Sequence, residues 1–323
     1  MGLNANAPKH EVLSGRASEI RAQANQQMDA TDSERDSWSS EFERMFVAKE
    51  LPYNDEGFRV LVQSCSLDVY REFESWCQQQ GISHKKFSFC NGKIIITEIG
   101  ITNAHARATG EFERQVLRYS SNNSPSVEEE LQNFRDAERI LGPIVRGPDA
   151  SFGGTHAHCP HLIFETARGQ SFAELCFYGR AFMAYSANAT TYIGIKLYVV
   201  PGYTGAENFQ MICVVYRKEF GITVANAVPE NLISFGTAPI AHPARLTSIY
   251  ARSNAPVGSM IGNTAAAGSV NCDQLGIDPP FTIHVSSASM FAPVAPPPHF
   301  AEDLLIDLYR VQRMAIQGHL SDL

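Results

Sequence analysis

Two acidic residues stand where a strand-turn-strand unit would bring them together. Asp149 follows Pro148 just beyond the short apolar pair Ile144-Val145, and Glu165 ends the apolar run Leu162–Phe164. A turn rich in glycine and histidine separates the two acids. A charge beside such an apolar run is costly to bury unless it is paired or binds a cation. Two short strands joined by this turn would place Asp149 and Glu165 side by side.

Neighbouring carboxylates favour a bound cation. They repel each other, which raises the pKa of one of them unless a positive charge neutralises both. Carboxylate and carbonyl oxygens are the ligands that hard divalent cations prefer. One hypothesis is therefore a Mg²⁺ site, able to take Mn²⁺, that Asp149 and Glu165 form on a hairpin. The other is purely structural, with a glutamate on an edge strand and an aspartate in a turn.

Four segments within about residues 90–200 follow one another in a characteristic order. They are Gly100–His105, which leads into a helix, Gly147–Phe152 with its Pro-Asp pair, Pro160–Glu165, and Ile193–Leu197 after a further helix. This order and spacing resemble the PD-(D/E)XK nuclease superfamily, and are closest to its branch of predicted restriction endonucleases. The resemblance implies a restriction-endonuclease-like core that cleaves phosphodiester bonds, in DNA, with a divalent metal.

The resemblance also implies roles for individual residues. Asp149 and Glu165 would bind Mg²⁺, and the carbonyl group of Thr166 would be a further ligand. In the superfamily an early helix often supplies an acidic residue to the site, which makes Glu111 another metal candidate. Glu98, at the end of a predicted strand, is an alternative to it.

The chain departs from the superfamily at one important position. The lysine expected two residues after the glutamate is replaced by Ala167, which cannot orient a water or stabilise charge. Some relatives move this function elsewhere, and the candidates here are Gln170, Arg180 and Lys196. For Lys196, on a following apolar strand, the catalytic interpretation competes with an edge lysine that protects the strand.

The elements that must position these residues follow from hydrophobic periodicity and turn signals. Helices are predicted over residues 37–49, 67–80, 104–119 (with Asn103 as N-cap), 127–141, 171–186 and 301–317. Strands are predicted over 87–89, 93–99, 162–165, 192–200, 209–217, 222–228, 231–235 and 282–285. A helix between two apolar strands favours a right-handed crossover and parallel pairing. The fold class is therefore α/β, with a mixed central sheet flanked by helices.

Three arginines of the predicted helix 104–119 fall on one face: Arg107, Arg114 and Arg118. Glu111 lies close enough by angle to pair with Arg107 or Arg114. One interpretation is a basic edge that contacts phosphate. The other is an exposed face of salt bridges.

The domain organisation predicted from composition has four parts. Residues 1–36 form a polar tail, 37–85 a helical N-terminal region, 86–220 the nuclease-like core, and 221–323 an irregular C-terminal extension that ends in a helix. The last helix would either dock on the core or form a homodimer contact.

Composition limits the function classes. The formal net charge of −8 argues against broad electrostatic binding to nucleic acid but leaves room for a local basic groove. No apolar run of membrane-spanning length and no signal-peptide core is present, and the seven cysteines include no CxxC pair. These features predict an intracellular protein, cytoplasmic or nuclear.

Other chemistries lack their usual signals, because there is no Gly-x-Ser-x-Gly elbow, P-loop or Gly-x-Gly-x-x-Gly. The alternative to a nuclease is a catalytically degenerate descendant of the fold that binds nucleic acid or protein. Ala167 and the acidic net charge favour that alternative.

Overall fold

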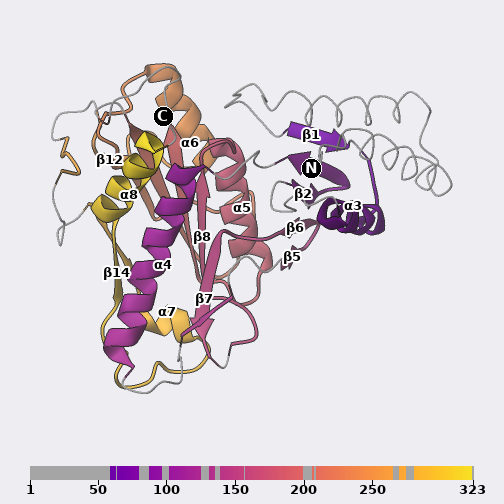
Figure 1. Cartoon of the computed structure of the whole chain (residues 1–323), viewed down its shortest axis with the longest axis horizontal. Helices are drawn as coiled ribbons and strands as arrows, with labels where there is room; N and C mark the ends of the chain where they lie inside the picture. The colour runs from indigo at the N-terminus through magenta and orange to yellow at the C-terminus, as the bar shows by residue number, and fades with distance from the viewer. Residues whose placement is uncertain are drawn as a thin grey trace, which may run out of the picture. The chain divides into compact units, whose positions relative to one another are not determined.

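The computed structural model of the chain has a mixed α/β fold around a seven-stranded sheet flanked by helices, as the sequence predicts (Figure 1). The residues that the structure describes are 59–62, 64–79, 87–96, 102–124, 131–134, 139–155, 157–198, 206, 209–264, 269–273 and 280–321. The predicted helix over 37–49 and Glu98 lie outside them.

The central sheet has the strand order β12–β11–β10–β9–β8–β7–β4. Neighbours are antiparallel except for β8–β9 and β11–β12. The strands are β4 (Leu131–Asn133), β7 (Ala150–Gly154), β8 (Leu162–Ala167), β9 (Thr191–Tyr198), β10 (Gln210–Arg217), β11 (Asn231–Ser234) and β12 (Ile261–Gly262). Helix α5 (Phe172–Tyr185) connects β8 to β9, so the predicted parallel pairing across this helix is confirmed.

A second, antiparallel sheet has the order β1–β3–β2–β6–β5. Its strands are β1 (Arg59–Val62), β2 (Phe87–Cys90), β3 (Lys93–Ile96), β5 (Arg139–Leu141) and β6 (Ile144–Arg146). The predicted β2–β3 hairpin turns at Asn91 and Gly92, with φ angles of 51° and 74°. This backbone favours the Asn-Gly pair. Residues 147–149 connect β6 to β7, so the Pro-Asp pair links the two sheets.

Helices cover both faces of the central sheet (Figure 1). Helices α4 (Asn103–Asn123) and α8 (Leu308–Leu320) share a core cluster on one face, and α5 and α6 (Pro243–Ser253) share a cluster on the other. The remaining described helices are α3 (Leu67–Gln79), which confirms the helix predicted over 67–80, and α7 (Ser287–Phe291). Among the described residues, no helix combines the length and apolarity needed to cross a bilayer.

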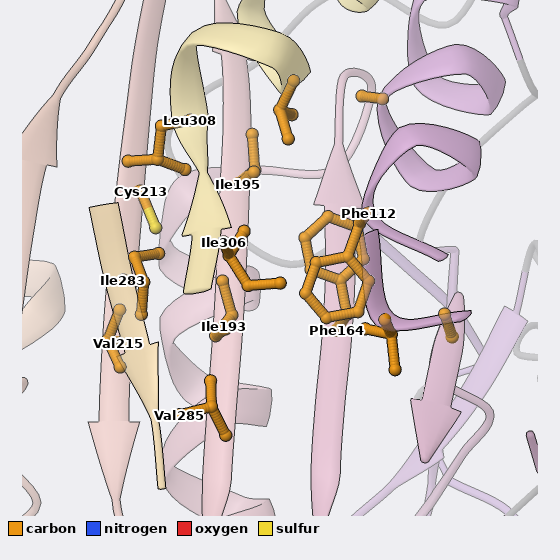
Figure 2. Packing of buried hydrophobic residues seen from close by; sticks show 14 of the residues in the cluster. Phe112, Phe164, Ile193, Ile195, Cys213, Val215, Ile283, Val285, Ile306 and Leu308 are labelled. Carbon is orange, nitrogen blue, oxygen red and sulfur yellow. The ribbon is translucent and has the colours of Figure 1, made fainter. Parts of the chain in front are cut away.

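The core under α4 depends on the C-terminal segment. Figure 2 shows Phe112 of α4 stacked on Phe164 of β8, with ring centroids 3.8 Å apart. Strands β13 (Thr282–Val285) and β14 (Leu304–Asp307) pair antiparallel and add apolar side chains to the same cluster, including Ile283 and Ile306. Because α8 also buries its apolar face there, the first of the two expectations for the last helix, docking on the core, is confirmed.

The helix predicted over 127–141 is wrong. Its described residues include two strands, β4 and β5, that pair with β7 and β6. Leu131 is buried opposite Gly154, and Leu141 is buried opposite Ile144. The glutamate-rich pattern favours a helix locally, but the backbone here gains its hydrogen bonds from strands elsewhere in the chain.

Three smaller predictions also need correction. Residues 222–228 form turns instead of a strand. The last helix begins at Leu308, not at 301, because residues 304–307 pair with β13 and Asp307 accepts hydrogen bonds from the N–H groups of Tyr309 and Arg310. The N-cap of α4 is Thr102, whose side chain accepts from the N–H of His105, and Asn103 is the first helical residue.

Two glycines provide a matched test of the packing between α4 and α8. A Cβ atom at Gly318 of α8 would overlap the backbone carbonyl of Asn103, whereas one at Gly110 of α4 would meet nothing within 4 Å. We therefore expect Gly318→Ala to lower the free energy of unfolding by about 1–3 kcal/mol. Gly110→Ala should raise it by about 0.5–1 kcal/mol, because alanine has the higher helix propensity.

Urea unfolding followed by circular dichroism measures both changes. Equal effects of the two substitutions would contradict the close approach of the helices.

Candidate active site

The strand registers bring Asp149 and Glu165 together. The register of β7 and β8 pairs Ala150 with Phe164, and extending it by one residue, to the position just before β7 begins, sets Asp149 opposite Glu165. Asp149 is tied to β8 directly, because its Oδ2 accepts a hydrogen bond of 2.7 Å from the backbone N–H of Thr166. The negative charge of Asp149 also contributes to the raised pKa of Glu165. The two predicted ligands thus lie close enough to interact electrostatically, with Asp149 beside His105 of α4 and Glu165 beside Arg146 of the second sheet.

Asp149 is the partly exposed acid of the pair, with 19% of its side chain accessible. Its Oδ2 lies 3.2 Å from Nε2 of His105, a buried residue in the first turn of α4. Burial alone would raise the pKa of Asp149. The charge and hydrogen bond of His105, with the Thr166 N–H, outweigh burial and hold the pKa below its usual value.

Glu165 is fully buried, and donors reach both of its carboxylate oxygens. Arg146 approaches in a two-pronged contact, with Nε 3.1 Å from Oε1 and Nη2 3.3 Å from Oε2. The hydroxyl of Tyr192 lies 3.2 Å from Oε2 and 3.0 Å from the carbonyl oxygen of Leu175, so its single hydrogen is shared between these two acceptors. Burial raises the pKa of Glu165, and the charge and hydrogen bonds of Arg146 oppose that rise without cancelling it.

Arg146 supplies the positive charge of the site. It is the last residue of β6, in the second sheet, and its guanidinium lies 4.7 Å from the ring centroid of Tyr178. Burial disfavours its charge, but the nearby Glu165 more than compensates and raises the pKa of Arg146. Asp149 contributes in the same direction. Arg146 was not among the residues predicted for the site; the available signal was an arginine between the strand Ile144-Val145 and the Pro-Asp pair.

Lys196 lies beside Ala167 on the neighbouring strand β9. The β8–β9 register pairs Ala167 with Lys196, and side-chain alternation puts Lys196 on the same face of the sheet as Glu165. Its Nζ donates to the carbonyl oxygens of Arg168 and Gln170, at 2.9 and 2.6 Å. The edge-lysine interpretation is wrong, because β9 lies between β8 and β10.

Gln170 is buried against the same network. Its Oε1 accepts from Nη2 of Arg146 over 3.3 Å. Its Nε2 is buried and has no hydrogen-bond partner among the residues that the structure describes. A buried amide N–H left unpaired is costly, so this group marks a position for a water or a ligand atom.

The other predicted site residues, Thr166, Glu111 and Arg180, form hydrogen bonds with different partners. Thr166 gives its N–H to Asp149, and its hydroxyl accepts from Thr109 over 3.1 Å. Glu111 accepts from Arg114 at 2.5 and 2.7 Å and from Gln115 at 3.1 Å, which confirms the predicted pairing with Arg114. Arg180 donates to the carbonyl of Arg252, near the end of α6.

In the described part of the chain, no group of three or more histidine, cysteine, aspartate or glutamate side chains is arranged to hold a metal ion. The structure therefore does not gather Glu111 with Asp149 and Glu165 into one such group. Any ion at this site would depend on the pair of acids together with backbone or water oxygens.

Comparison with models of protein families and with curated proteins gives no match. Among solved structures, a chain described as a "putative nuclease belonging to DUF820" from Anabaena variabilis aligns with 53% of this chain and 92% of its own length. The TM-score is 0.33 and the sequence identity is 12%. A likeness this distant carries no argument about function.

The environment of Asp149 predicts a specific pH dependence. Because its folded pKa lies below the unfolded value of about 4, its contribution is present above about pH 4 and is lost as the pH falls through the folded pKa. We expect Asp149→Asn to lower the free energy of unfolding at pH 7 by about 1–3 kcal/mol. The difference from the unmodified protein should shrink below about pH 4.

Urea unfolding at a series of pH values tests this. Glu219→Gln, an acid-to-amide change at an exposed position, is the matched control and should leave the curve unchanged. A difference for Asp149→Asn that stays constant down to pH 3 would exclude the proposed role of the carboxylate.

Proposed function

We propose that the chain is a metal-dependent nuclease of PD-(D/E)XK type that hydrolyses phosphodiester bonds, with DNA as its substrate. The observation that carries the proposal is the pair of registers around β8. One sets Asp149 opposite Glu165, and the other sets Lys196 beside Ala167. The two acids match the sequence resemblance, and Lys196 on the neighbouring strand stands next to the position where the resemblance calls for a lysine and the chain has Ala167.

The donor set fits a hard divalent cation. Asp149 and Glu165 offer carboxylate oxygens, and the carbonyl of Thr166 on the same strand offers a third oxygen. The site already attracts positive charge, because the guanidinium of Arg146 contacts Glu165 and interacts electrostatically with Asp149. The unpaired Nε2 of Gln170 is a hydrogen-bond donor, so it can bind a water or phosphate oxygen next to such an ion but not the ion itself. We assign Mg²⁺, with Mn²⁺ as a substitute, to Asp149, Glu165 and the carbonyl group of Thr166.

A metal held there would lower the pKa of a bound water and stabilise negative charge on the phosphate. Among the protein's own residues, Gln170 is the candidate to orient that water, because its amide N–H is buried and unpaired. Lys196 would act as a positioning residue, since its ammonium binds the carbonyl groups on both sides of Gly169 and so fixes the segment that carries Gln170.

Contact with nucleic acid would come from basic side chains near the site. Arg107 is exposed on α4 two residues after His105, and Arg168 is partly exposed beside Ala167. Because phosphate contacts position a nucleic acid without reading its sequence, these arginines fit a backbone-binding role.

A second candidate function is a binding module without turnover, and a specific observation favours it. Glu165 is fully buried and already engaged by Arg146 and Tyr192, while the usual lysine is replaced by Ala167. A protein that has lost catalytic activity could retain the ion pair of Arg146 and Glu165 because it stabilises the fold. Turnover separates the two candidates.

Plasmid nicking with Mg²⁺ or Mn²⁺ is the test. We expect the unmodified protein to nick supercoiled DNA, and Asp149→Asn to lose activity by about 100-fold or more, because a metal ligand is removed. Glu219→Gln, at an exposed turn, is the matched control and should retain full activity. Absence of nicking in all three proteins, with either metal, would favour the binding module.

A further inference from the structure

The two acids of the site have a cation of the protein's own. Arg146 contacts both oxygens of Glu165, and its charge also interacts with that of Asp149. No other side chain in the described part of the chain is recorded in an ion pair with Glu165. The guanidinium therefore occupies the role that a metal ion would otherwise have for this acid, namely neutralising a carboxylate that is shielded from water.

Arg146 is held by more than its charge. Its planar group lies over the ring of Tyr178, whose hydroxyl is hydrogen-bonded to Ser88 of β2. It also donates to Oε1 of Gln170. Since Ser88 and Arg146 belong to the second sheet and Glu165 to the central one, the contact is part of the junction between the sheets. The arginine is thus a built feature and not a mobile surface cation.

We propose that Arg146 is an internal counter-cation that competes with a divalent ion for Glu165 and thereby sets the metal affinity of the site. This inference rests on the proposed function for the identity of the ligands. Its physical basis is simple. Like charges repel strongly in a site shielded from water, so a divalent ion gains the full benefit of Glu165 only when the guanidinium gives up that carboxylate.

The two acids then have unequal roles. Asp149 is partly exposed and is held by neutral or histidine donors, so it is available to an arriving ion. Glu165 is buried behind it and neutralised. The first acid would provide initial binding, and release of the second from Arg146 would limit the final affinity.

The test is Mn²⁺ binding to the full chain without substrate, measured by isothermal titration calorimetry. We expect Arg146→Gln to bind Mn²⁺ about tenfold more tightly than the unmodified protein, which corresponds to about 1.4 kcal/mol. Asp149→Asn, and the double change Arg146→Gln with Asp149→Asn, should lose binding by a similar factor or more. Equal or weaker Mn²⁺ binding by Arg146→Gln would overturn the proposal.

Arg146→Gln leaves Glu165 buried without its cation and is expected to destabilise the fold in the absence of metal, so Arg146→Lys provides a second measurement. Lysine keeps a charge but cannot contact both carboxylate oxygens at once. We expect it to bind Mn²⁺ about threefold more tightly than the unmodified protein, between arginine and glutamine. Binding equal to or weaker than that of the unmodified protein would again overturn the proposal.

The binding and nicking results separate the two proposals. If Arg146→Gln binds Mn²⁺ no more tightly but the unmodified protein nicks DNA in an Asp149-dependent way, this inference fails and the proposed function stands. If Arg146→Gln binds Mn²⁺ more tightly through Asp149 and neither protein nicks DNA, the competition stands and the nuclease assignment fails.

Discussion

Neutralisation of a buried carboxylate is the constraint on which the site depends. Glu165 lies in the middle of a fully covered strand, where an uncompensated charge would be strongly destabilising. Its compensation comes from Arg146, which reaches across from the other sheet. The contact between Arg146 and Glu165 therefore both joins the two sheets and neutralises the buried acid.

The registers around β8 show how a short segment of backbone can assemble several chemical groups. The antiparallel partner β7 sets the position of Asp149, and the parallel partner β9 sets that of Lys196. Because a strand presents alternate side chains to opposite faces, a shift of one residue in either register would move these groups to the wrong side of the sheet. The apolar residues between them, such as Phe164 and Ile195, hold the register by their burial under α4.

Much of this central unit could be predicted from the sequence because its signals are local. The hairpin at Asn91-Gly92, the cap at Ser171 and the apolar strands on either side of α5 each depend on neighbouring residues. The capping box formed by Ser171 and Glu174 fixes where α5 begins, and hence where the segment carrying Gln170 ends.

The features that could not be predicted depend on partners distant in the chain. Residues 131–133 carry a helical pattern but pair with β7, and residues 304–307 precede a helix but pair with β13. The contact of Arg146 with Glu165 crosses from one sheet to another, so strand periodicity gives no sign of it. Glu111 was predicted as a metal ligand because it lies on an early helix. Its position around the helix axis directs its carboxylate to Arg114 and Gln115.

The late position of β13, β14 and α8 in the chain affects how the protein folds during synthesis. These segments, from residue 282 to 320, cover apolar side chains of β9 and β10, and β10 ends at residue 217, 65 residues before β13 begins. Until these segments are synthesised, that face of the nascent sheet stays open to water and to other chains. Such an interval favours recruitment of a chaperone during translation, because exposed apolar strands aggregate readily.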